Sequence, residues 1–199
     1  MTCNFTFKHY DECMQICSLL HFPGTSSIEL IHDIDSAEEN LLEIGQMEAN
    51  WGLSAKYFIR IHAKQYNPFS LKNINMYKKL IELGHEIGLH FEPNFYEKGQ
   101  IREAIEKQVS LFSFELGTPV KLISLHEPAR FGTIDESFVP EGLTLYCYTS
   151  EHYKGKKYIS DSGGRWREGC MCNHLGKHDK MIILTHPWWW FEKNSAENY

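Results

Sequence analysis

Side chains that can bind metals or transfer protons recur in this sequence at the ends of short apolar runs. Five residues share this position: Asp33, Asp35, His90, His126 and His186. Carboxylate and imidazole groups together suit zinc or another first-row divalent cation. Imidazole also exchanges a proton readily near neutral pH. The pattern therefore predicts one shared site for metal binding and proton transfer.

Spacing along each run separates residues that share a face from those that do not. Asp33 and Asp35 are two residues apart, so both face the same side of a strand. One of them can then ligate a metal while the other accepts a proton. His90 and Glu92 share a face for the same reason. His85 and His90 lie on opposite faces, which favours a structural role for His85 over a His-x4-His metal pair.

Alternating helix-like and strand-like segments must position these residues. The expected helices cover residues 7–20, 36–50, about 75–83 and about 100–116. The expected strands cover residues 28–31, 55–59, 86–91, 120–125, 143–148, 157–160 and 181–185. Ser36 is a good N-cap, with Glu38 and Glu39 in the first turn of its helix. This alternation implies βαβ units around a parallel sheet or barrel, in which sites form at the carboxyl ends of the strands.

Composition excludes several classes of protein. The 199 residues are 42% hydrophobic and 14% aromatic, unlike disordered chains, collagen or coiled coils. Length and the lack of a linker predict a single domain over residues 1–199. The net charge of −6 gives no reason to expect a nucleic-acid partner. No apolar stretch approaches the ~20 residues of a membrane span.

The amino terminus and the cysteines predict a compartment. The first residues lack a basic start followed by an apolar run, so no signal peptide is expected. Six cysteines in such a chain are then expected as reduced thiols rather than as a disulfide framework. These features favour a cytoplasmic location.

Several motifs resemble those of a known family. Residues 32–35 read His-Asp-Ile-Asp, and residues 83–90 read Leu-Gly-His-Glu-Ile-Gly-Leu-His. Residues 55–58 read Ala-Lys-Tyr-Phe, and residues 182–186 read Ile-Ile-Leu-Thr-His. Taken in their order along the chain, these motifs resemble the polysaccharide deacetylase family of the NodB-homology, carbohydrate-esterase type. The resemblance runs from about residue 28 to residue 190 and implies an α/β fold, a distorted (β/α) barrel.

The resemblance also implies roles for the residues at the strand ends. Asp33 would be the catalytic base and His186 the general acid. Asp35 and His90 would hold a divalent metal, with zinc foremost and cobalt, nickel or manganese as alternatives. The implied reaction removes an acetyl group from an N-acetylated sugar or sugar precursor of surface-polysaccharide or cell-envelope metabolism.

Two departures from the family pattern concern the metal. The position of the family's second metal histidine is Asn94 here. The family's Arg-x-Pro-Tyr segment reads His-Glu-Pro-Ala-Arg-Phe at residues 126–131. His126 is the best substitute as third ligand, since it ends a strand, and Glu92 and Asn94 are weaker candidates.

Polar and aromatic residues around the expected site suit a carbohydrate partner. The candidate substrate-binding residues are Glu92, Asn94, Arg130, Asp161, Trp166 and Trp188. Tryptophan faces can cover the apolar side of a sugar ring, although the same side chains also fill protein cores. Asp161 and Arg165 can hydrogen-bond sugar hydroxyls or position another catalytic group.

Three other interpretations stay open. A glycosidase would use Asp33 and a second carboxylate. A sugar-binding or partner protein would keep the barrel without the metal, which Asn94 favours. The pair Cys170 and Cys172, followed by His174 and His178, has the ligand types of a small zinc site, although buried thiols are the simpler interpretation. The sequence leaves the oligomeric state open.

Overall fold

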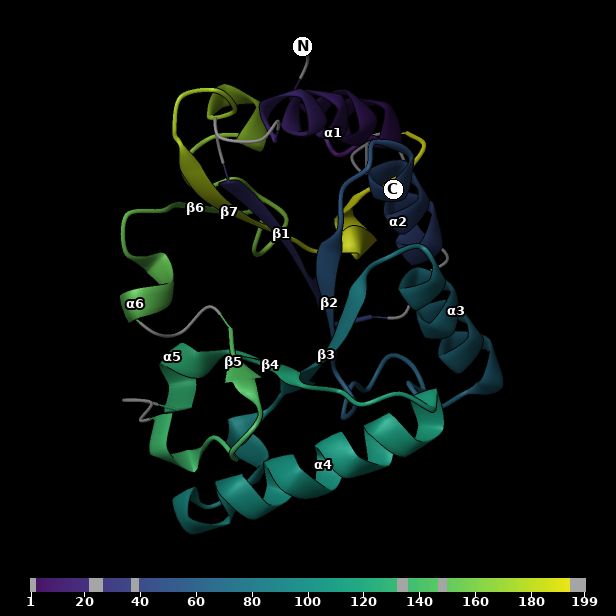
Figure 1. Ribbon diagram of the computed structural model, residues 1–199, viewed down its shortest axis with the longest axis vertical. Helices are drawn as coiled ribbons and strands as arrows, with labels where there is room; N and C mark the ends of the chain where they lie inside the picture. The colour runs from purple at the N-terminus through teal and green to yellow at the C-terminus, as the bar shows by residue number, and fades with distance from the viewer. Residues whose placement is uncertain (1–2, 22–26, 37–39, 132–135, 147–149, 194–199) are drawn as a thin grey trace.

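Parallel strands form a single sheet in this protein. The computed structural model describes residues 3–21, 27–36, 40–131, 136–146 and 150–193. Within them, seven strands pair in the order β5-β4-β3-β2-β1-β7-β6, and every pair is parallel. The strands are β1 (Ser27–Ile34), β2 (Ala55–Ile59), β3 (Glu86–Phe91), β4 (Leu122–Leu125), β5 (Thr144–Leu145), β6 (Lys157–Ser160) and β7 (Lys180–Thr185). The curled sheet with its surrounding helices confirms the expected α/β, distorted (β/α)-barrel architecture (Figure 1).

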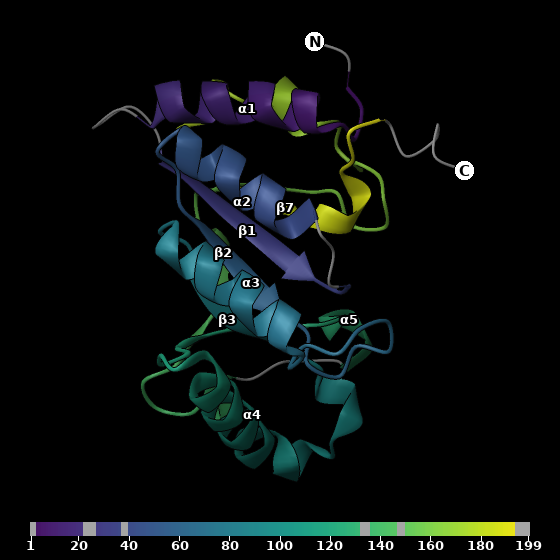
Figure 2. The same ribbon diagram turned by 90° about the vertical axis from the view of Figure 1, so that its right-hand side faces the viewer.

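Helices cover the outer face of this sheet. The four longer ones are α1 (Phe7–Leu20), α2 (Asn40–Asn50), α3 (Leu71–Glu82) and α4 (Ile101–Leu116). They lie one below another on the same side of the strands (Figure 2). Shorter helical turns include α5 (Pro128–Phe131), α6 (Ser150–Tyr153), η1 (Pro93–Phe95), η4 (Met171–Asn173) and η5 (Pro187–Trp189). None of the helices in the described residues has both the length and the apolar character that crossing a bilayer requires.

Most element boundaries agree with the sequence-based expectations, and the differences have local causes. The first strand continues to Ile34 and so contains Asp33. The third helix begins earlier than expected, at Leu71, because the Ser70 side chain caps it by accepting a hydrogen bond from the Asn73 amide. The fifth strand is confined to residues 144–145. Its expected end at residues 147–148 lies outside the described residues, as do Glu38 and Glu39.

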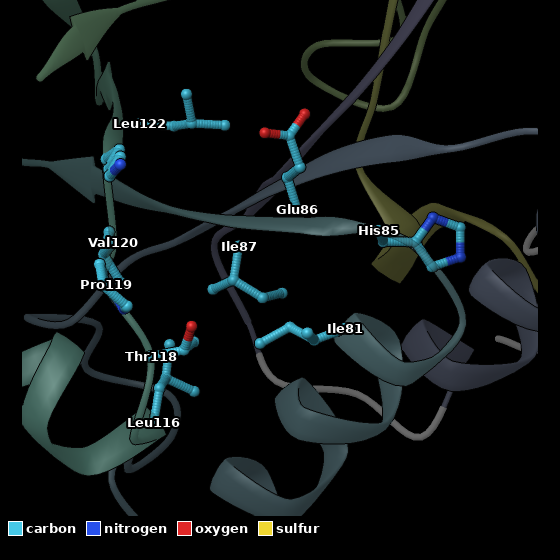
Figure 3. Close-up of a pocket in the computed structure, with 10 residues that line it drawn as sticks. Ile81, His85, Glu86, Ile87, Leu116, Thr118, Pro119, Val120 and Leu122 are labelled. Carbon is cyan, nitrogen blue, oxygen red and sulfur yellow. The ribbon is translucent and has the colours of Figure 1, made fainter.

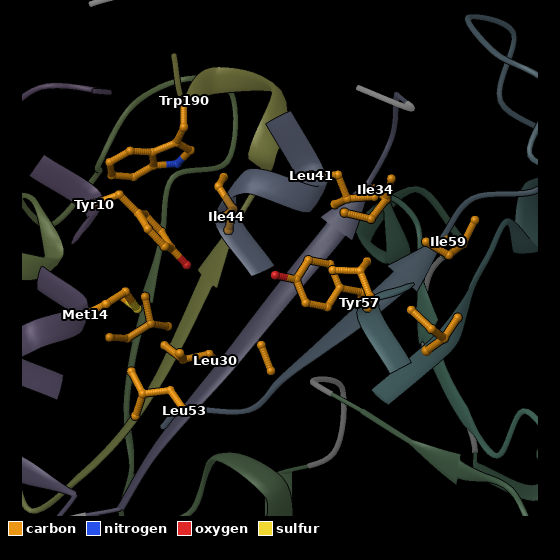
Figure 4. Packing of buried hydrophobic residues seen from close by; sticks show 14 of the residues in the cluster. Tyr10, Met14, Leu30, Ile34, Leu41, Ile44, Leu53, Tyr57, Ile59 and Trp190 are labelled. Atoms are coloured by element: carbon orange, nitrogen blue, oxygen red, sulfur yellow. The ribbon is translucent and has the colours of Figure 1, made fainter. Parts of the chain in front are cut away.

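Alternate residues of β1 serve two different cores. Leu30 and Ile34 face the helices, where they join a cluster with Tyr10, Tyr57 and Trp190 (Figure 4). Ile31, the residue between them, faces the other way and joins the interior cluster of Phe58, Ile182 and Leu184. Burying one such side chain stabilises the fold by roughly 1.5–3 kcal/mol. This alternation commits His32 to the helix side and Asp33 to the interior side.

Gly88 is required by close packing on the interior face of β3. A Cβ atom there would lie 2.6 Å from the Phe58 ring and 2.9 Å from the Leu122 carbonyl oxygen. Both neighbours belong to adjacent strands, so a larger residue would push the strands apart. Gly88 and His90 thus lie on the same face of β3. The first must be small, and the second projects into the site.

Candidate metal and catalytic site

Three candidate metal ligands meet at the carboxyl edge of the sheet. Asp35 follows β1, His90 lies near the end of β3, and His126 follows β4. Their ligand atoms all lie within 4.8 Å of one another. Asp35 Oδ1 is 3.1 Å from His126 Nδ1 and 3.7 Å from His90 Nε2. The two ring nitrogens are themselves 3.1 Å apart.

The pairing of β3 with β4 explains why His126 reaches this point. His90 pairs with Ser124 in the sheet, and the amide of His126 donates to the Phe91 carbonyl at 2.7 Å. His126 is two residues beyond Ser124 and therefore projects to the same side. The short strand β4 thus positions His126, which the sequence favoured as the third ligand, next to Asp35 and His90.

Asp33 is linked to the same group through Ser124. His90 Nδ1 lies 2.6 Å from Ser124 Oγ, and Ser124 Oγ donates to Asp33 Oδ1 at 3.5 Å. Asp33 Oδ1 is also 3.5 Å from His90 Nδ1. A proton on Nδ1 orients the His90 ring and leaves Nε2 free to face Asp35, as outer hydrogen bonds do for ligating histidines.

Asp161 holds His186 on the other side of the site. His186 Nδ1 lies 2.7 Å from Asp161 Oδ1, and the amide of His186 donates to the same carboxylate at 3.0 Å. The indole of Trp190 donates to Asp161 Oδ2 at 3.1 Å. This arrangement leaves His186 Nε2 facing Asp35 Oδ2 at 3.9 Å. Asp161 is completely buried, so it is not placed to contact a sugar. It instead fits the other role expected for it, that of positioning a catalytic group, here His186.

The surroundings shift the pKa values of three side chains in the site in different directions. Burial raises the pKa of Asp35, but the surrounding imidazoles, His126 foremost, outweigh burial and hold it well below its usual range. Burial lowers the pKa of His90. Burial also lowers the pKa of His186, but the hydrogen bond and charge of Asp161 outweigh this effect and raise it to about 9. The site therefore offers an ionised carboxylate, a neutral imidazole and an imidazole that stays protonated at neutral pH.

The donor set fits a divalent cation. Asp35 Oδ1 is buried and has no hydrogen-bond partner among the described residues, although two ring nitrogens lie 3.1 and 3.7 Å from it. A buried carboxylate oxygen left in this state costs free energy. Two imidazole nitrogens and one carboxylate oxygen are also a common set of protein ligands in catalytic zinc sites. Asp35 and His126 keep 25% and 16% of their side chains exposed, so solvent can reach the centre.

Arg60 was missed by the sequence analysis, although the same strand-end rule applies to it. It follows β2 directly, and its guanidinium donates to Glu92 Oε1 at 2.5 Å and lies 4.0 Å from Asp35 Oδ1. Glu92 is buried in this ion pair and is outside the group of three ligand atoms. Ser124 was also missed, although it lies two residues before His126.

The remaining sequence candidates lie around or away from the site. Asn94 is exposed in η1. Arg130 is exposed and pairs with Glu127 at 2.7 Å. Trp166 stacks on Phe5, with ring centroids 6.2 Å apart, and packs against the helix-side core. This placement differs from the expected role of Trp166 at a sugar-binding rim.

The triple tryptophan segment divides between core and surface. Trp188 and Trp189 are partly buried, with ring centroids 4.0 Å apart. Trp190 is completely buried. Trp188 therefore keeps part of its surface exposed two residues after His186, while Trp190 belongs to the support of Asp161.

His85 has the expected structural role. Its Nδ1 accepts from the Ala55 amide at 3.1 Å, and its Nε2 donates to the Gly45 carbonyl at 2.9 Å. These two bonds join α2, β2 and the start of β3. A pocket next to His85 is lined by Ile81, Ile87 and Leu122 among others (Figure 3). It lies at the amino ends of β3 and β4, and ligand sites in parallel sheets form at the opposite edge.

Comparison with known proteins reveals likeness in structure rather than in sequence. No protein-family model matches the chain, and no curated protein matches it. Solved structures of family 4 carbohydrate esterases superpose on most of it. A family 4 pseudoenzyme from Bacillus anthracis has 15% identity and a TM-score of 0.52, with 83% of this chain and 56% of that chain covered. The chain thus spans just over half the length of that protein.

Two further solved structures have similar scores. A family 4 carbohydrate esterase from Streptomyces lividans, in complex with acetate, has 12% identity and a TM-score of 0.53, with 82% and 80% coverage. A peptidoglycan N-acetylglucosamine deacetylase has 16% identity and a TM-score of 0.52, with 87% and 78% coverage. The fold of this protein is therefore that of family 4 carbohydrate esterases, which agrees with the resemblance seen in the sequence motifs.

Proposed function

We propose that this protein is a metal-dependent hydrolase that removes an acetyl group from an N-acetylated sugar or sugar precursor. One observation carries the proposal: ligand atoms of Asp35, His90 and His126 converge within 4.8 Å. A carboxylate, Asp33, and an imidazole, His186, flank them. A fold shared with an N-acetylglucosamine deacetylase and with an acetate-bound esterase supports the same chemistry.

Asp35, His90 and His126 would hold the divalent ion. Zinc is the first choice because imidazole nitrogen and carboxylate oxygen suit it, and cobalt, nickel and manganese accept the same donors. When bound, such an ion supplies Lewis-acid activation of water and stabilisation of negative charge. Hydrogen bonding of His90 Nδ1 to Ser124 orients this ligand.

Asp33 and His186 would move the protons. Asp33 takes a proton from the water whose oxygen bonds to the acetyl carbon. The carbon–nitrogen bond then breaks, and His186 Nε2 donates a proton to the departing sugar amine, so that acetate and a free amino group result. Asp161 favours this role because it keeps His186 protonated at neutral pH.

The test is metal reconstitution followed by an assay for acetate. Chelator-treated protein is supplied with zinc, cobalt, nickel or manganese and incubated with N-acetylglucosamine oligomers. We expect acetate release only with metal, and no new reducing ends. New reducing ends without acetate would instead favour the glycosidase interpretation.

A matched pair of variants tests the role of Asp33. Asp33→Asn is expected to lower turnover by roughly 10²–10⁴-fold, the usual contribution of a general base, while metal content stays unchanged. Asp179→Asn is the control, because Asp179 is exposed at the amino end of β7, the opposite edge of the sheet. Unchanged turnover in Asp33→Asn would reject the base assignment.

A metal-free sugar-binding protein is the second candidate. The similar fold of a pseudoenzyme and the exposed Asn94 at the family's second histidine position favour it. This candidate predicts carbohydrate binding that is unchanged by chelator and no acetate release with any of the four metals. Calorimetry with and without chelator separates it from the hydrolase.

A further inference from the structure

A second group of side chains of metal-ligand type lies where α1 and the segment around η4 come together (Figure 1). Its members are Cys3, His9, Cys170 and Cys172. Their ligand atoms all lie within 4.8 Å of one another. Cys3 Sγ is 3.2 Å from Cys172 Sγ, and His9 Nε2 is 3.1 Å from Cys170 Sγ.

Backbone contacts explain how these distant segments meet. Phe5 and Phe7 pair with Phe191, through hydrogen bonds of 3.0 and 2.9 Å. The pairing holds the segment that follows Cys3 against the chain just after η5. Thr6 caps α1 by accepting a hydrogen bond from the His9 amide at 3.2 Å, so His9 lies in the first turn.

We propose that Cys3, His9, Cys170 and Cys172 bind a structural zinc ion. Three thiolates and one imidazole form one of the common donor sets of closed, tetrahedral zinc sites. Bond lengths of ~2.3 Å to sulfur and ~2.0–2.1 Å to nitrogen place tetrahedral ligand atoms about 3.5–3.8 Å apart. The two shortest separations, 3.1 and 3.2 Å, are just below this range and none exceeds 4.8 Å, so small side-chain adjustments close the site.

The surroundings of His9 support a ligand there. Its side chain is nearly fully buried, and within the described part of the chain its Nε2 contacts two sulfurs, those of Cys170 and Cys13, at 3.1 and 3.8 Å. Its Nδ1 is buried and has no partner among the described residues. An imidazole with only weak sulfur partners is poorly compensated for its lost hydration. A cation bound at Nε2 would replace these weak sulfur partners at that nitrogen, and the ring proton would then be on Nδ1.

This ligand set differs from the one that the sequence pattern suggested. His174 Nε2 lies 3.0 Å from the Glu168 carbonyl oxygen, and its ring stacks on His178 with centroids 5.8 Å apart. Neither histidine belongs to the group around Cys170. The fold replaces them with Cys3 and His9, more than 160 residues away in sequence.

The proposed ion would hold α1 close to Trp190 and Asp161, the residues that position His186. The His9 ring stacks on Trp190, with centroids 6.3 Å apart. Trp190 donates to Asp161, which holds His186. Zinc binding would also close a very long loop, and its binding free energy would add to the free energy of folding. The site is therefore structural, and it has no open position for substrate.

Cobalt substitution of the full chain, purified under reducing conditions, tests the proposal. We expect one cobalt ion with intense thiolate-to-metal charge-transfer absorption. An ion held by Asp35, His90 and His126 lacks thiolate ligands and gives no such band, so the two metal sites are read separately. Failure of the hydrolase proposal would leave this signal unchanged.

Variants distinguish the proposed ligands from nearby residues. Cys170→Ser and Cys3→Ser are expected to lose the charge-transfer band and one equivalent of zinc. Cys3 is exposed and precedes α1, so Cys3→Ser keeps the test valid if Cys170→Ser fails to fold. Cys17→Ala, His174→Asn and His178→Asn are matched controls that should keep both. Chelator should lower the melting temperature of the wild type and of these controls.

Three results would overturn the proposal. The first is a cobalt protein without thiolate absorption. The second is full zinc retention in Cys3→Ser or Cys170→Ser. The third is a Cys3–Cys172 disulfide in the native protein, found by mass spectrometry under non-reducing conditions, together with no thiolate-bound zinc.

Discussion

Two imidazole–carboxylate networks lie on opposite faces of β1, one residue apart in sequence. His32 faces α2, where its Nε2 is 2.7 Å from Glu48 Oε1. Asp33 faces the interior, where its Oδ1 is 3.5 Å from His90 Nδ1. Both networks contain buried carboxylates and imidazoles, yet they differ in how completely their polar atoms are partnered.

The network around Glu48 is saturated. Glu48 Oε1 also accepts from the Tyr10 hydroxyl at 2.6 Å, and Oε2 accepts from the Tyr57 hydroxyl at 2.5 Å. The second nitrogen of His32 lies 2.7 Å from Thr185 Oγ1. Burial raises the pKa of Glu48, but the charge and hydrogen bond of His32 outweigh it, and the net pKa is lowered. All these side chains are buried, so the network joins α1, α2 and the sheet without access for substrate.

The network around Asp35 is unsaturated and open. Its Oδ1 has no hydrogen-bond partner among the described residues, while a quarter of the side chain is exposed. Buried polar groups are normally partnered, and an unbound ion is one explanation for an exception. Two networks of the same chemistry thus differ in exposure and in how many of their polar atoms have partners, and these two properties distinguish the structural network from the candidate reactive one.

The largest expected effect is on the open side of the sheet. His90→Ala removes one of three ligands, so we expect loss of stoichiometric metal from this centre and turnover reduced by more than ~10³-fold, because metal and positioning are lost together. Metal analysis and acetate release measure this. His85→Ala, which changes the histidine directly before β3 that contacts Ala55 and Gly45, is expected to retain metal. Metal retention in His90→Ala would contradict the comparison.

Removing the carboxylate of Glu48 from the fully partnered network should lower stability rather than metal content. Glu48→Ala leaves His32 and two tyrosine hydroxyls buried without their partner, so we expect the free energy of unfolding to fall by about 3–5 kcal/mol. Urea denaturation measures it, with the exposed Glu43→Ala on the same helix as control. Asp33→Asn should change stability far less. If the Glu48→Ala protein were as stable as the control, the hydrogen bonds around Glu48 would not be what stabilises the fold here.

The Asp161–His186 pair connects the two kinds of network and predicts a pH dependence. The pKa of His186 is about 9 in the folded protein, against about 6.5 in an unfolded chain. Below pH ~6.5 both states carry the proton, so the full stabilisation of about 3 kcal/mol is present. It is lost progressively as the pH rises through 9, because the folded state then releases a proton that the unfolded state has already lost.

Asp161→Asn should remove this dependence. We expect chelator-treated wild type to lose stability between pH 6.5 and pH 9, and the variant to show a flatter curve over that range. In the metal-loaded enzyme, the alkaline limb of the activity profile should move to lower pH, because His186 would lose its proton earlier. Parallel stability curves for the two proteins would contradict the assignment of Asp161 as the positioning residue.

The smallest effect is expected at the exposed rim. Arg130→Ala breaks a surface pair with Glu127, so we expect the free energy of unfolding to change by less than about 0.5 kcal/mol. A higher KM with unchanged kcat would identify Arg130 as a sugar contact. A large loss of stability would show that exposure is a poor guide to the role of a charged pair in this protein.

Local sequence patterns determined the elements and the faces of their side chains. The apolar runs predicted β2 and β3 to the residue, and the two-residue spacing of Asp33 and Asp35 predicted their common face. Such features depend on short-range sterics and on the alternation of side chains along a strand, so they can be read from a few neighbouring residues. Strand ends likewise marked His90 and His186.

Contacts between distant residues depended on the tertiary structure. The sequence favoured His126 over Asn94 as third ligand, but the pairing of β3 with β4 is what brings His126 to Asp35, and the contact with Trp190 holds Asp161 at His186. The thiols of Cys170 and Cys172 lie next to Cys3 and His9, and His174 and His178 are not part of this group. Contacts of this kind depend on the register of the whole sheet and on the summed packing of the helices against it, and no local pattern records either.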